Sequence, residues 1–300
     1  MKLQEKERSR YLRTDFIIEK FFLICALSSI LVIALIFIFL FKEGIQTFIY
    51  VSPIQFFAGG IWQPVASEPK YGILPLLAGS ILVTLGATVI AVPIGILCAT
   101  YLAEVSNPAA REILKPMIEI LAGVPSVVFG FIALTVLADL THGIFNTTYR
   151  LNALNGAVIL AVMIMPTVVS VSEDAISAVP KEYKEAALAL GATRWEASRR
   201  AVLPAALSGI MVAAMLGIGR AIGETMAVLM ATGNAPLLTF DLLSSVETMT
   251  ATIAIEMGEV AFGSPHYHAL FAIGLVLFAM TFIVNLIAEL VSAKFRSLRY

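Results

Sequence analysis

Residues 185–191 read Glu-Ala-Ala-Leu-Ala-Leu-Gly, and the pair Leu203-Pro204 follows twelve residues after the glycine. This stretch interrupts a very apolar chain, because the segment Lys181–Arg200 carries five basic residues among good helix formers. A segment of that composition belongs in water. Its small residues let another protein approach closely, its glycine permits a turn of the backbone, and its proline favours the first turn of the next helix. The stretch therefore predicts a helical docking element outside a membrane.

The rest of the chain has the composition of an integral membrane protein. Hydrophobic residues make up 59% of its 300 residues and charged residues only 14%, which exceeds what a soluble domain of this length hides in its core. The apolar runs are long enough to cross a hydrocarbon core of about 30 Å. They predict an all-α protein with six membrane-spanning helices, at Phe21–Phe41, Ile73–Leu102, Pro116–Ala138, Leu154–Ser172, Ala205–Ala231 and Ala269–Val291.

Basic residues predict the orientation, since short loops rich in Lys and Arg stay in the cytoplasm. Those that flank the spans on one side are Lys2, Lys6, Arg8, Arg10, Arg13, Lys20, Arg111, Lys115, Lys181, Lys184, Arg194, Arg199, Arg200, Lys294, Arg296 and Arg299. The loops on the opposite side hold only Lys42, Lys70 and Arg150. We therefore expect both termini and the docking element to face the cytoplasm.

The predicted spans and loops divide the chain into consecutive parts. We expect a cytoplasmic basic tail at 1–20, a first span at 21–41, an external loop at 42–72, a five-helix core at 73–291 and a cytoplasmic tail at 292–300. Within the core we expect a cytoplasmic coupling loop at 174–204 and an external segment at 233–268.

The chain lacks the signature of a nucleotide-hydrolysing enzyme. No glycine is followed by lysine, so the Gly-x4-Gly-Lys-Ser/Thr loop that cradles nucleotide phosphates is absent. If ATP drives a process in which this chain takes part, the ATPase must be a separate chain. Cys25 and Cys98 both fall in apolar spans, which leaves no disulfide framework and no metal-ligand spacing. The basic residues are explained by topology rather than by nucleic acid. We expect a non-catalytic chain that binds no metal or cofactor of its own.

Arg220 is the only Lys or Arg inside a predicted span, and it lies in a string that continues to Glu224 and Thr225. A charge there costs about 2.5–3.5 kcal/mol on insertion scales, so another group has to offset it. Glu224 follows four residues later, which predicts an ion pair along one face of a helix. Two interpretations remain open. Either the pair braces neighbouring helices, or Arg220 lines a water-accessible path and meets an anion while Glu224 holds its side chain.

The docking stretch resembles the Glu-Ala-Ala signature of permease subunits of ATP-binding-cassette importers. In that signature a glycine follows three residues after Glu-Ala-Ala, and an aliphatic-x-Leu-Pro string follows nine residues later. The residues that match are Glu185, Ala186, Ala187, Gly191, Leu203 and Pro204, whereas Ala201 replaces the usual aliphatic residue. The resemblance implies that these six residues contact the ATPase. An ordinary amphipathic cytoplasmic loop is the alternative interpretation.

Three further strings resemble the membrane subunits of the phosphate-specific (Pst) importer, most of all the PstC type: Tyr71–Leu76, Ala122–Phe131 and Gly219–Ala227. The resemblance covers nearly the whole chain. It implies a type I importer permease fold in a bacterial or archaeal plasma membrane, with half of a pore for inorganic phosphate and a path role for Arg220. The partners that it implies are a PstA-like second permease subunit, two copies of a PstB-like ATPase that uses ATP and Mg, and an external PstS-like phosphate-binding protein.

Three alternatives to a PstC-type permease stay open. A PstA-type subunit shares most of the motifs. A permease for sulfate, molybdate or an amino acid is also possible, because the docking signature says nothing about cargo. A secondary transporter would also be helical with an intramembrane charged pair, but it would have no use for a docking loop, and it often shows internal repeats, which this chain does not.

Overall fold

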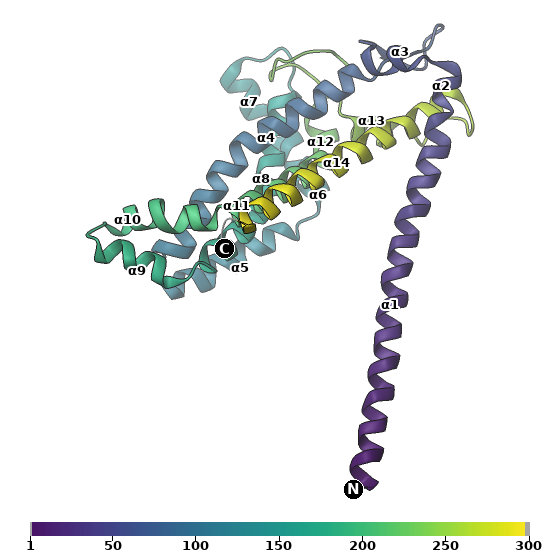
Figure 1. The fold of residues 1–300 in the computed structure, drawn as a ribbon. Coiled ribbons are helices and arrows are strands. Elements are labelled where there is room, and N and C mark those ends of the chain that lie inside the picture. Colours follow the sequence, from purple (N-terminus) through teal and green to yellow (C-terminus); the bar gives the residue numbers. More distant parts are fainter. Residues whose placement is uncertain (1, 298–300) are drawn as a thin grey trace.

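The computed structural model describes residues 2–297, and for residues 2–15, 17 and 291–297 it describes the backbone alone. The last residues of the predicted tail at 292–300, Arg299 among them, lie outside that range. The chain is mostly helical (Figure 1). In order, the elements are α1 (Lys2–Ile45), α2 (Thr47–Tyr50), α3 (Pro53–Ala58), β1 (Trp62–Gln63), β2 (Lys70–Tyr71), α4 (Leu74–Thr100), the π-helix η1 (Tyr101–Val105), α5 (Pro108–Ala122), α6 (Ser126–Ile132), the π-helix η2 (Ala133–Leu137), α7 (Ala138–Phe145), α8 (Ala153–Ser177), α9 (Lys181–Ala189), α10 (Arg194–Ala197), the π-helix η3 (Ser198–Val202), α11 (Leu203–Ile222), α12 (Met226–Ala231), α13 (Met249–Glu256) and α14 (Pro265–Ser297).

Within residues 2–297, six helical segments are long and apolar enough to cross a membrane, which confirms the predicted number of spans. Their bounds are Ile18–Tyr50, Leu74–Val105, Ser126–Phe145, Ala153–Ser177, Arg194–Ile222 and Pro265–Leu290. The first, second, fourth and sixth overlap the predicted spans closely.

The third span lies later in the chain than the predicted Pro116–Ala138. The prediction joined two helices that the structure separates at Gly123–Pro125. Gly123 ends α5, and Pro125, which has no backbone N–H to donate, precedes the first turn of α6. The helix α5 is a separate amphipathic element, because Arg111 and Lys115 bind α8 while Ile113, Met117 and Ile120 stay exposed.

The fifth span also differs from the predicted Ala205–Ala231. The helix starts earlier, at Arg194, and it ends at Ile222 instead of continuing through Gly223. A three-residue break, Gly223–Thr225, then separates α11 from the short helix α12. This correction matters for the candidate site, since Arg220 lies in the last turn of α11 and not in the middle of a span.

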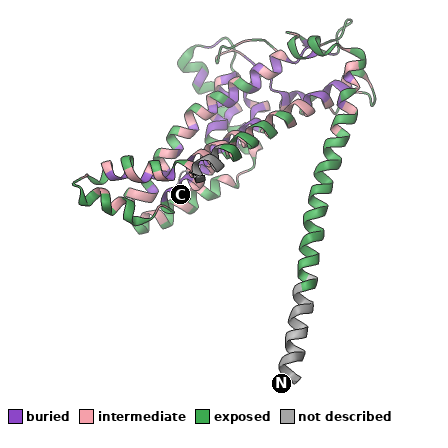
Figure 2. Cartoon of the chain, viewed as in Figure 1, coloured by how far each residue is buried: buried purple, intermediate pink, exposed green. Residues whose placement is uncertain are grey.

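The helix α8 is the centre of the body and packs against both α4 and α11. Small residues allow the close approach, because a Cβ at Gly95 of α4 or at Gly217 of α11 would come within 3.0 Å of Val168 on α8. Buried residues accordingly concentrate where these three helices meet (Figure 2). The resulting frame holds the residues of interest at fixed positions.

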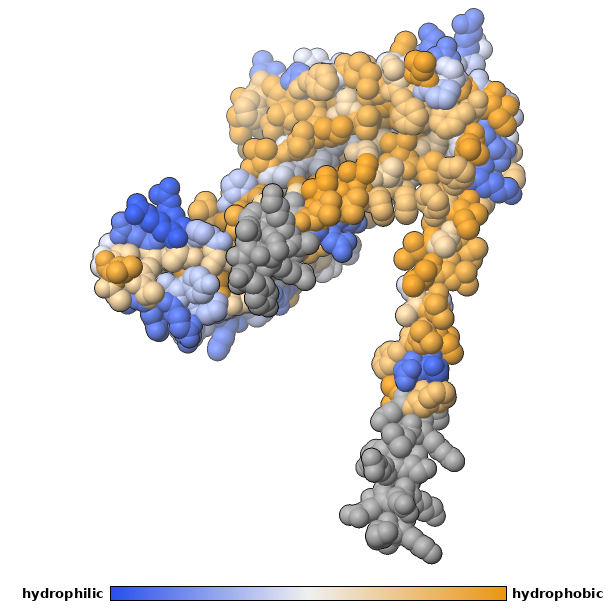
Figure 3. Space-filling view, viewed as in Figure 1, coloured by the Kyte–Doolittle hydropathy of each residue, from blue (hydrophilic) through white to orange (hydrophobic). Residues whose placement is uncertain are grey.

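The helix α1 stands away from this body and touches it near one end (Figure 1). There Gly44 lies against the backbone of Ala272, and Phe39 and Phe37 contact Phe271 and Phe278 of α14. The exposed part of α1 is mostly hydrophobic (Figure 3). This surface belongs in lipid or against another membrane-spanning chain.

Candidate coupling and translocation sites

The predicted docking element forms an arm of two antiparallel helical segments at one end of the body (Figure 1). The first segment is α9, and the second starts at α10 and continues through η3 into α11. The turn between them uses Gly191, whose φ of +86° lies in the left-handed region that favours glycine. The amides of Gly191 and Ala192 donate to the carbonyls of Leu188 and Ala187, which closes the end of α9 as a Schellman motif.

The second segment of the arm begins with a capping box. The hydroxyl of Thr193 accepts from the Glu196 amide, and the Glu196 carboxylate accepts in return from the Thr193 amide. The sequence analysis did not identify this signal. Together with the glycine it makes the tip of the arm a rigid turn rather than a loose loop.

The arm exposes the residues that a partner would need. Glu185 and Ala186 are exposed and Ala187 is half-buried. Next to them, Leu190 is 89% and Trp195 56% exposed. The arm's surface is otherwise largely hydrophilic (Figure 3). Large apolar side chains at the tip of a polar arm form a surface suited to contact with another protein.

Leu203 and Pro204, the other two members of the motif, lie at the base of the arm and not at its tip. Leu203 is half-buried against the core between α4, α8 and α11. Pro204 lies in the first turn of α11, as predicted, although the helical chain continues back without a gap to Arg194. The π-helix η3 ends at Val202, two residues before Pro204, and such a widened turn accommodates a residue that cannot donate a backbone hydrogen bond.

A cavity of about 470 Å³ separates α9 from the body. Its walls include Lys184 and Leu188 from α9 and Glu104 from η1. Helix α9 buries none of its residues, so it packs only loosely against the membrane-spanning helices. Arg111 and Ser177 also line this cavity, and together with Lys115 they donate to the fully buried Glu173 of α8.

Arg220 does not form the ion pair with Glu224 that its spacing predicted, and none of the ion pairs between described residues includes either side chain. Because α11 ends at Ile222, Glu224 is not one turn further along the same helix. Instead the Arg220 guanidinium donates to the hydroxyl of Thr167 at 3.3 Å and to the carbonyl of Ala122 at 3.5 Å. Ala122 is the last residue of α5.

These contacts explain how the chain carries a half-buried charge at this position. The last carbonyls of a helix lack intrahelical partners and bear partial negative charge, so a cation is favoured there by about 0.3–1 kcal/mol. The charge of Arg220 is thus only partly offset, and by neutral groups. The predicted Arg220–Glu224 pair, which both interpretations used, is absent, and Arg220 instead links α11 to α5 and α8.

Glu224 and Thr225 belong to the break that follows. One carboxylate oxygen of Glu224 accepts from the amide of Ala227 at 3.1 Å, and its carbonyl accepts from the hydroxyl of Thr250 at 2.7 Å. The Thr225 hydroxyl donates to the carbonyl of Gly223 at 3.4 Å. Glu224 therefore caps the start of α12, and these contacts hold the break in shape.

The two helix breaks lie next to each other. Helix α6, after the first break, packs closely on α12, after the second: a Cβ at Gly130 would come within 3.1 Å of Met226 and within 2.8 Å of Met230. Arg220 bridges the same junction from α11 to the end of α5. Non-helical backbone at membrane depth is tolerated where it is buried in protein or lines a watery passage. This junction is the candidate translocation site.

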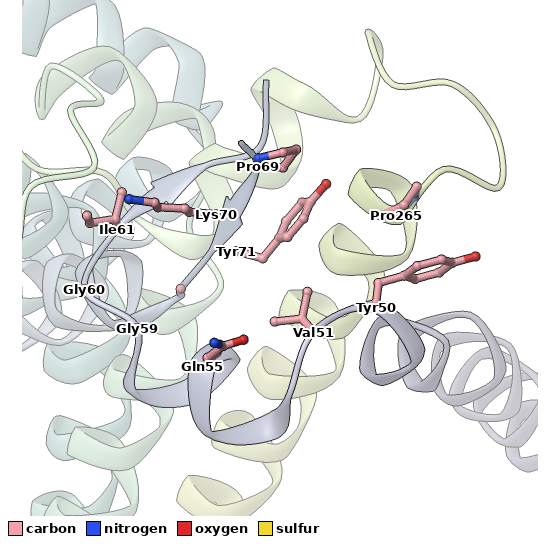
Figure 4. A pocket seen from close by; sticks show the side chains of 11 residues that line it. Tyr50, Val51, Gln55, Gly59, Gly60, Ile61, Pro69, Lys70, Tyr71 and Pro265 are labelled. Atoms are coloured by element: carbon pink, nitrogen blue, oxygen red, sulfur yellow. The ribbon is translucent and has the colours of Figure 1, made fainter. Parts of the chain in front are cut away.

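A second cavity, of about 580 Å³ (Figure 4), lies beside α2 and α3, at the opposite end of the body from the arm (Figure 1). Tyr50 and Pro265 line it at the ends of the first and sixth spans, and Tyr71 lines it three residues before the second span. None of the predicted site residues lines it. Tyrosines at this level are typical of a membrane–water boundary.

Comparison with known proteins places the chain in a family. Residues 91–297 match the model described as "Binding-protein-dependent transport system inner membrane component". The chain is 40% identical over 272 residues to the "Probable ABC transporter permease protein YqgH" of Bacillus subtilis (strain 168), which covers 90% of this chain and 88% of the relative. It is 37% identical over 254 residues to the "Phosphate transport system permease protein PstC" of Mesorhizobium japonicum, which covers 78% and 77% of the two chains.

Solved structures share the fold at low sequence identity. A subunit of the MetNI methionine ABC transporter in an inward-facing conformation gives a TM-score of 0.54 at 18% identity, over 75% of this chain and 94% of that one. A subunit of a bacterial alginate importer gives 0.57 at 16% identity, over 89% and 95%. The fold is therefore that of a type I ABC importer permease, as predicted. The chain belongs to the family of inner-membrane components of binding-protein-dependent transport systems, the non-catalytic permease subunits that work with a separate ATPase and a substrate-binding protein.

Proposed function

We propose that this chain forms half of the pore of an ATP-driven importer of inorganic phosphate. Two relatives of similar length support the general role, and the one from Mesorhizobium japonicum is named as a phosphate transport permease. In this proposal Glu185, Ala186, Ala187 and Gly191 contact the ATPase, and Leu203 and Pro204 support the arm from below. The path runs past Arg220.

The observation that carries the cargo assignment is the state of Arg220. Its guanidinium binds a hydroxyl and a backbone carbonyl, and no carboxylate pairs with it among the described residues. A guanidinium so bound keeps net positive charge and spare N–H donors. Two parallel donors match the oxygens of a phosphate, and the attraction is large where water is scarce. A weak pair of neutral contacts is also easily exchanged for a passing anion.

Glu224 and Thr225 have an indirect role in this proposal. They shape the break between α11 and α12, and so they set where the last turn of α11 presents Arg220. Because Glu224 caps a helix and does not pair with Arg220, its charge is not required to hold the guanidinium. This replaces the earlier hypothesis that Glu224 directly restrains Arg220.

The partners in the proposed complex are a PstA-like permease that completes the pore, two PstB-like ATPases that hydrolyse ATP with Mg, and a PstS-like binding protein outside. Both termini and the arm face the cytoplasm, in a plasma (inner) membrane. The apolar surface of α1 lies in lipid or on the second permease. The distribution of basic residues supports this orientation.

Cargo identity is tested on the purified complex. The chain is expressed with its neighbouring subunits, the co-eluting proteins are identified, and ATP hydrolysis is measured in liposomes with the binding protein and phosphate, sulfate or molybdate. We expect an ATPase and a second permease to co-elute, and phosphate alone to stimulate hydrolysis. Stimulation by sulfate or molybdate and not by phosphate would reject the cargo assignment.

A further inference from the structure

Glu104 is a half-buried carboxylate that connects both helices of the docking arm to the body. Its Oε2 accepts from Nζ of Lys184 on α9 at 2.6 Å and from the hydroxyl of Ser198 at the start of η3 at 2.9 Å. Its side chain is 11% exposed and that of Lys184 is 30% exposed. The carboxylate itself belongs to η1, which continues α4. Three segments that are far apart in the sequence thus meet at one oxygen atom.

This contact is unusual in how much of the arm depends on it. Among the residues that the structure describes, Lys184–Glu104 is the only side-chain hydrogen bond or ion pair that joins α9 to the rest of the chain. Helix α9 buries no residue, and the cavity of about 470 Å³ lies beneath it. Apolar packing therefore does little to set the angle between α9 and the body, so the ion pair has to do so.

On the body side of this contact, η1 is connected through α5 to Arg220. Ser106 and Asn107 are the two residues that join η1 to α5, and the Asn107 side chain caps α5 by accepting from the amide of Ala110. The other end of α5 is Ala122, whose carbonyl binds Arg220. A displacement of η1 therefore also moves α5, whose last carbonyl, that of Ala122, binds the Arg220 guanidinium.

The helix α5 is stiff enough to pass such a displacement on. Arg111 and Lys115 on α5 bind the fully buried Glu173 of α8, and Lys115 also binds Asp174 at 2.6 Å. Hydrogen bonds to Asp174 and Glu173 raise the pKa of Lys115, so this cation stays charged at physiological pH. These ion pairs hold the first half of α5 against α8, whereas residues 116–122, which end at Ala122, form no ion pair among the described residues.

We propose that Glu104, Lys184 and Ser198 form a clasp that transmits movement of the ATPase-bound arm to α5 and Arg220. These are positioning residues, because none of them contacts the anion. The inference rests on the proposed function for its transport readout only. When the ATPase moves α9, the clasp pulls η1 with it, and the end of α5 shifts relative to Arg220. Without the clasp, α9 moves over its cavity and α5 stays where it was.

The test uses the complete complex and compares three variants with a matched control. Lys184→Met removes the charge and keeps the side chain's length. The double variant Glu104→Lys with Lys184→Glu reverses the ion pair, and the Ser198 hydroxyl can then accept a hydrogen bond from the new lysine at position 104. The control is Lys181→Met, which makes the same change on α9 at an exposed residue without an ion pair among the described residues. Ser198→Ala removes one donor without changing charge.

The primary measurement is hydrogen–deuterium exchange in residues 108–122, with and without vanadate-trapped nucleotide, because it needs no cargo. We expect nucleotide to change exchange in α5 for the wild type and the control but not for Lys184→Met, and the reversed pair to restore the change. We expect uptake per ATP hydrolysed to fall about tenfold in Lys184→Met, within the range typical of coupling between sites. The Ser198→Ala complex should give an exchange response and an uptake per ATP between those of the wild type and of Lys184→Met.

The clasp is contradicted if Lys184→Met behaves like Lys181→Met in both measurements, or if the reversed pair assembles but restores nothing. If Lys184→Met does not assemble, Ser198→Ala decides: a nucleotide response in α5 equal to the wild type overturns the clasp. A wild-type complex that shows the exchange response but takes up no phosphate contradicts the proposed cargo and leaves the clasp standing.

Discussion

Glu247 offers a quantitative test of the packing between the external segment and α4. It lies in the loop before α13 and is 5% exposed. Its carbonyl lies so close to Gly79 of α4 that a Cβ there would approach to 2.3 Å. Burial raises the pKa of the Glu247 carboxyl from 4.5 to about 7, with a smaller contribution from nearby Glu256 and an opposing one from a hydrogen bond with Thr252.

The sign of the effect follows from linkage. Because the pKa is higher in the folded state, the folded chain binds the proton more tightly, and stability declines as pH rises from about 4.5 through about 7. A shift of this size, at about 1.4 kcal/mol per pKa unit, costs the folded state about 3 kcal/mol at pH 8 and about 1 kcal/mol at pH 5. Glu247→Gln keeps the shape and an acceptor for Thr252 but cannot ionise, so it removes this cost.

The assay is thermal unfolding of the detergent-solubilised protein at pH 5 and pH 8, followed by tryptophan fluorescence. Trp62 reports on this region because its indole N–H donates to Glu256 at 2.9 Å. At about 2 °C per kcal/mol we expect Glu247→Gln to raise Tm by about 6 °C at pH 8 and about 2 °C at pH 5. The exposed Glu259→Gln serves as the charge-matched control. An equal Tm gain at both pH values, or a loss at pH 8, would refute the reasoning.

Three further predictions concern coupling, the path and topology. Gly191→Val should insert normally but lose stimulated ATP hydrolysis, since a left-handed φ costs an L side chain about 1–2 kcal/mol. Gly191→Asn should keep most of the stimulated hydrolysis, and equal activity of the two variants would contradict the need for a left-handed turn. Glu224→Gln should retain uptake because its amide oxygen still caps α12, while Glu224→Ala should destabilise that helix by about 1 kcal/mol; an inactive Gln variant at normal abundance would mean that the charge itself is needed. A topology reporter at Ser67 should read as external and one at Arg194 as cytoplasmic, and the reverse result at either position would reject the orientation.

The number of spans followed from the sequence because a membrane demands long apolar runs, and those are visible without a structure. The residues at which the helices end could not be predicted in the same way. Gly123–Pro125 and Gly223–Thr225 both fell inside predicted spans, and the structure breaks the helices there, where α6 packs on α12. The predicted Arg220–Glu224 pair failed for the same reason, since i and i+4 face each other only while the helix continues.

The docking turn was accessible to sequence reasoning since its determinants are local. Gly191 supplies the left-handed residue, and the Thr193–Glu196 capping box was present in the sequence, although the analysis passed over it. The contacts of Glu104 with Lys184 and of Arg220 with Ala122 join residues 80 and 98 positions apart. No periodicity links such positions, so the clasp and the true neighbours of Arg220 required the fold.

The most direct test of the central claim is uptake of radiolabelled phosphate by liposomes that contain the complete complex, with wild-type Arg220 or with Arg220→Leu. We predict that the wild-type complex accumulates phosphate in an ATP-dependent manner. The Arg220→Leu complex should assemble to the same level and keep basal ATP hydrolysis, but accumulate none. Uptake by Arg220→Leu at the wild-type rate would contradict the account.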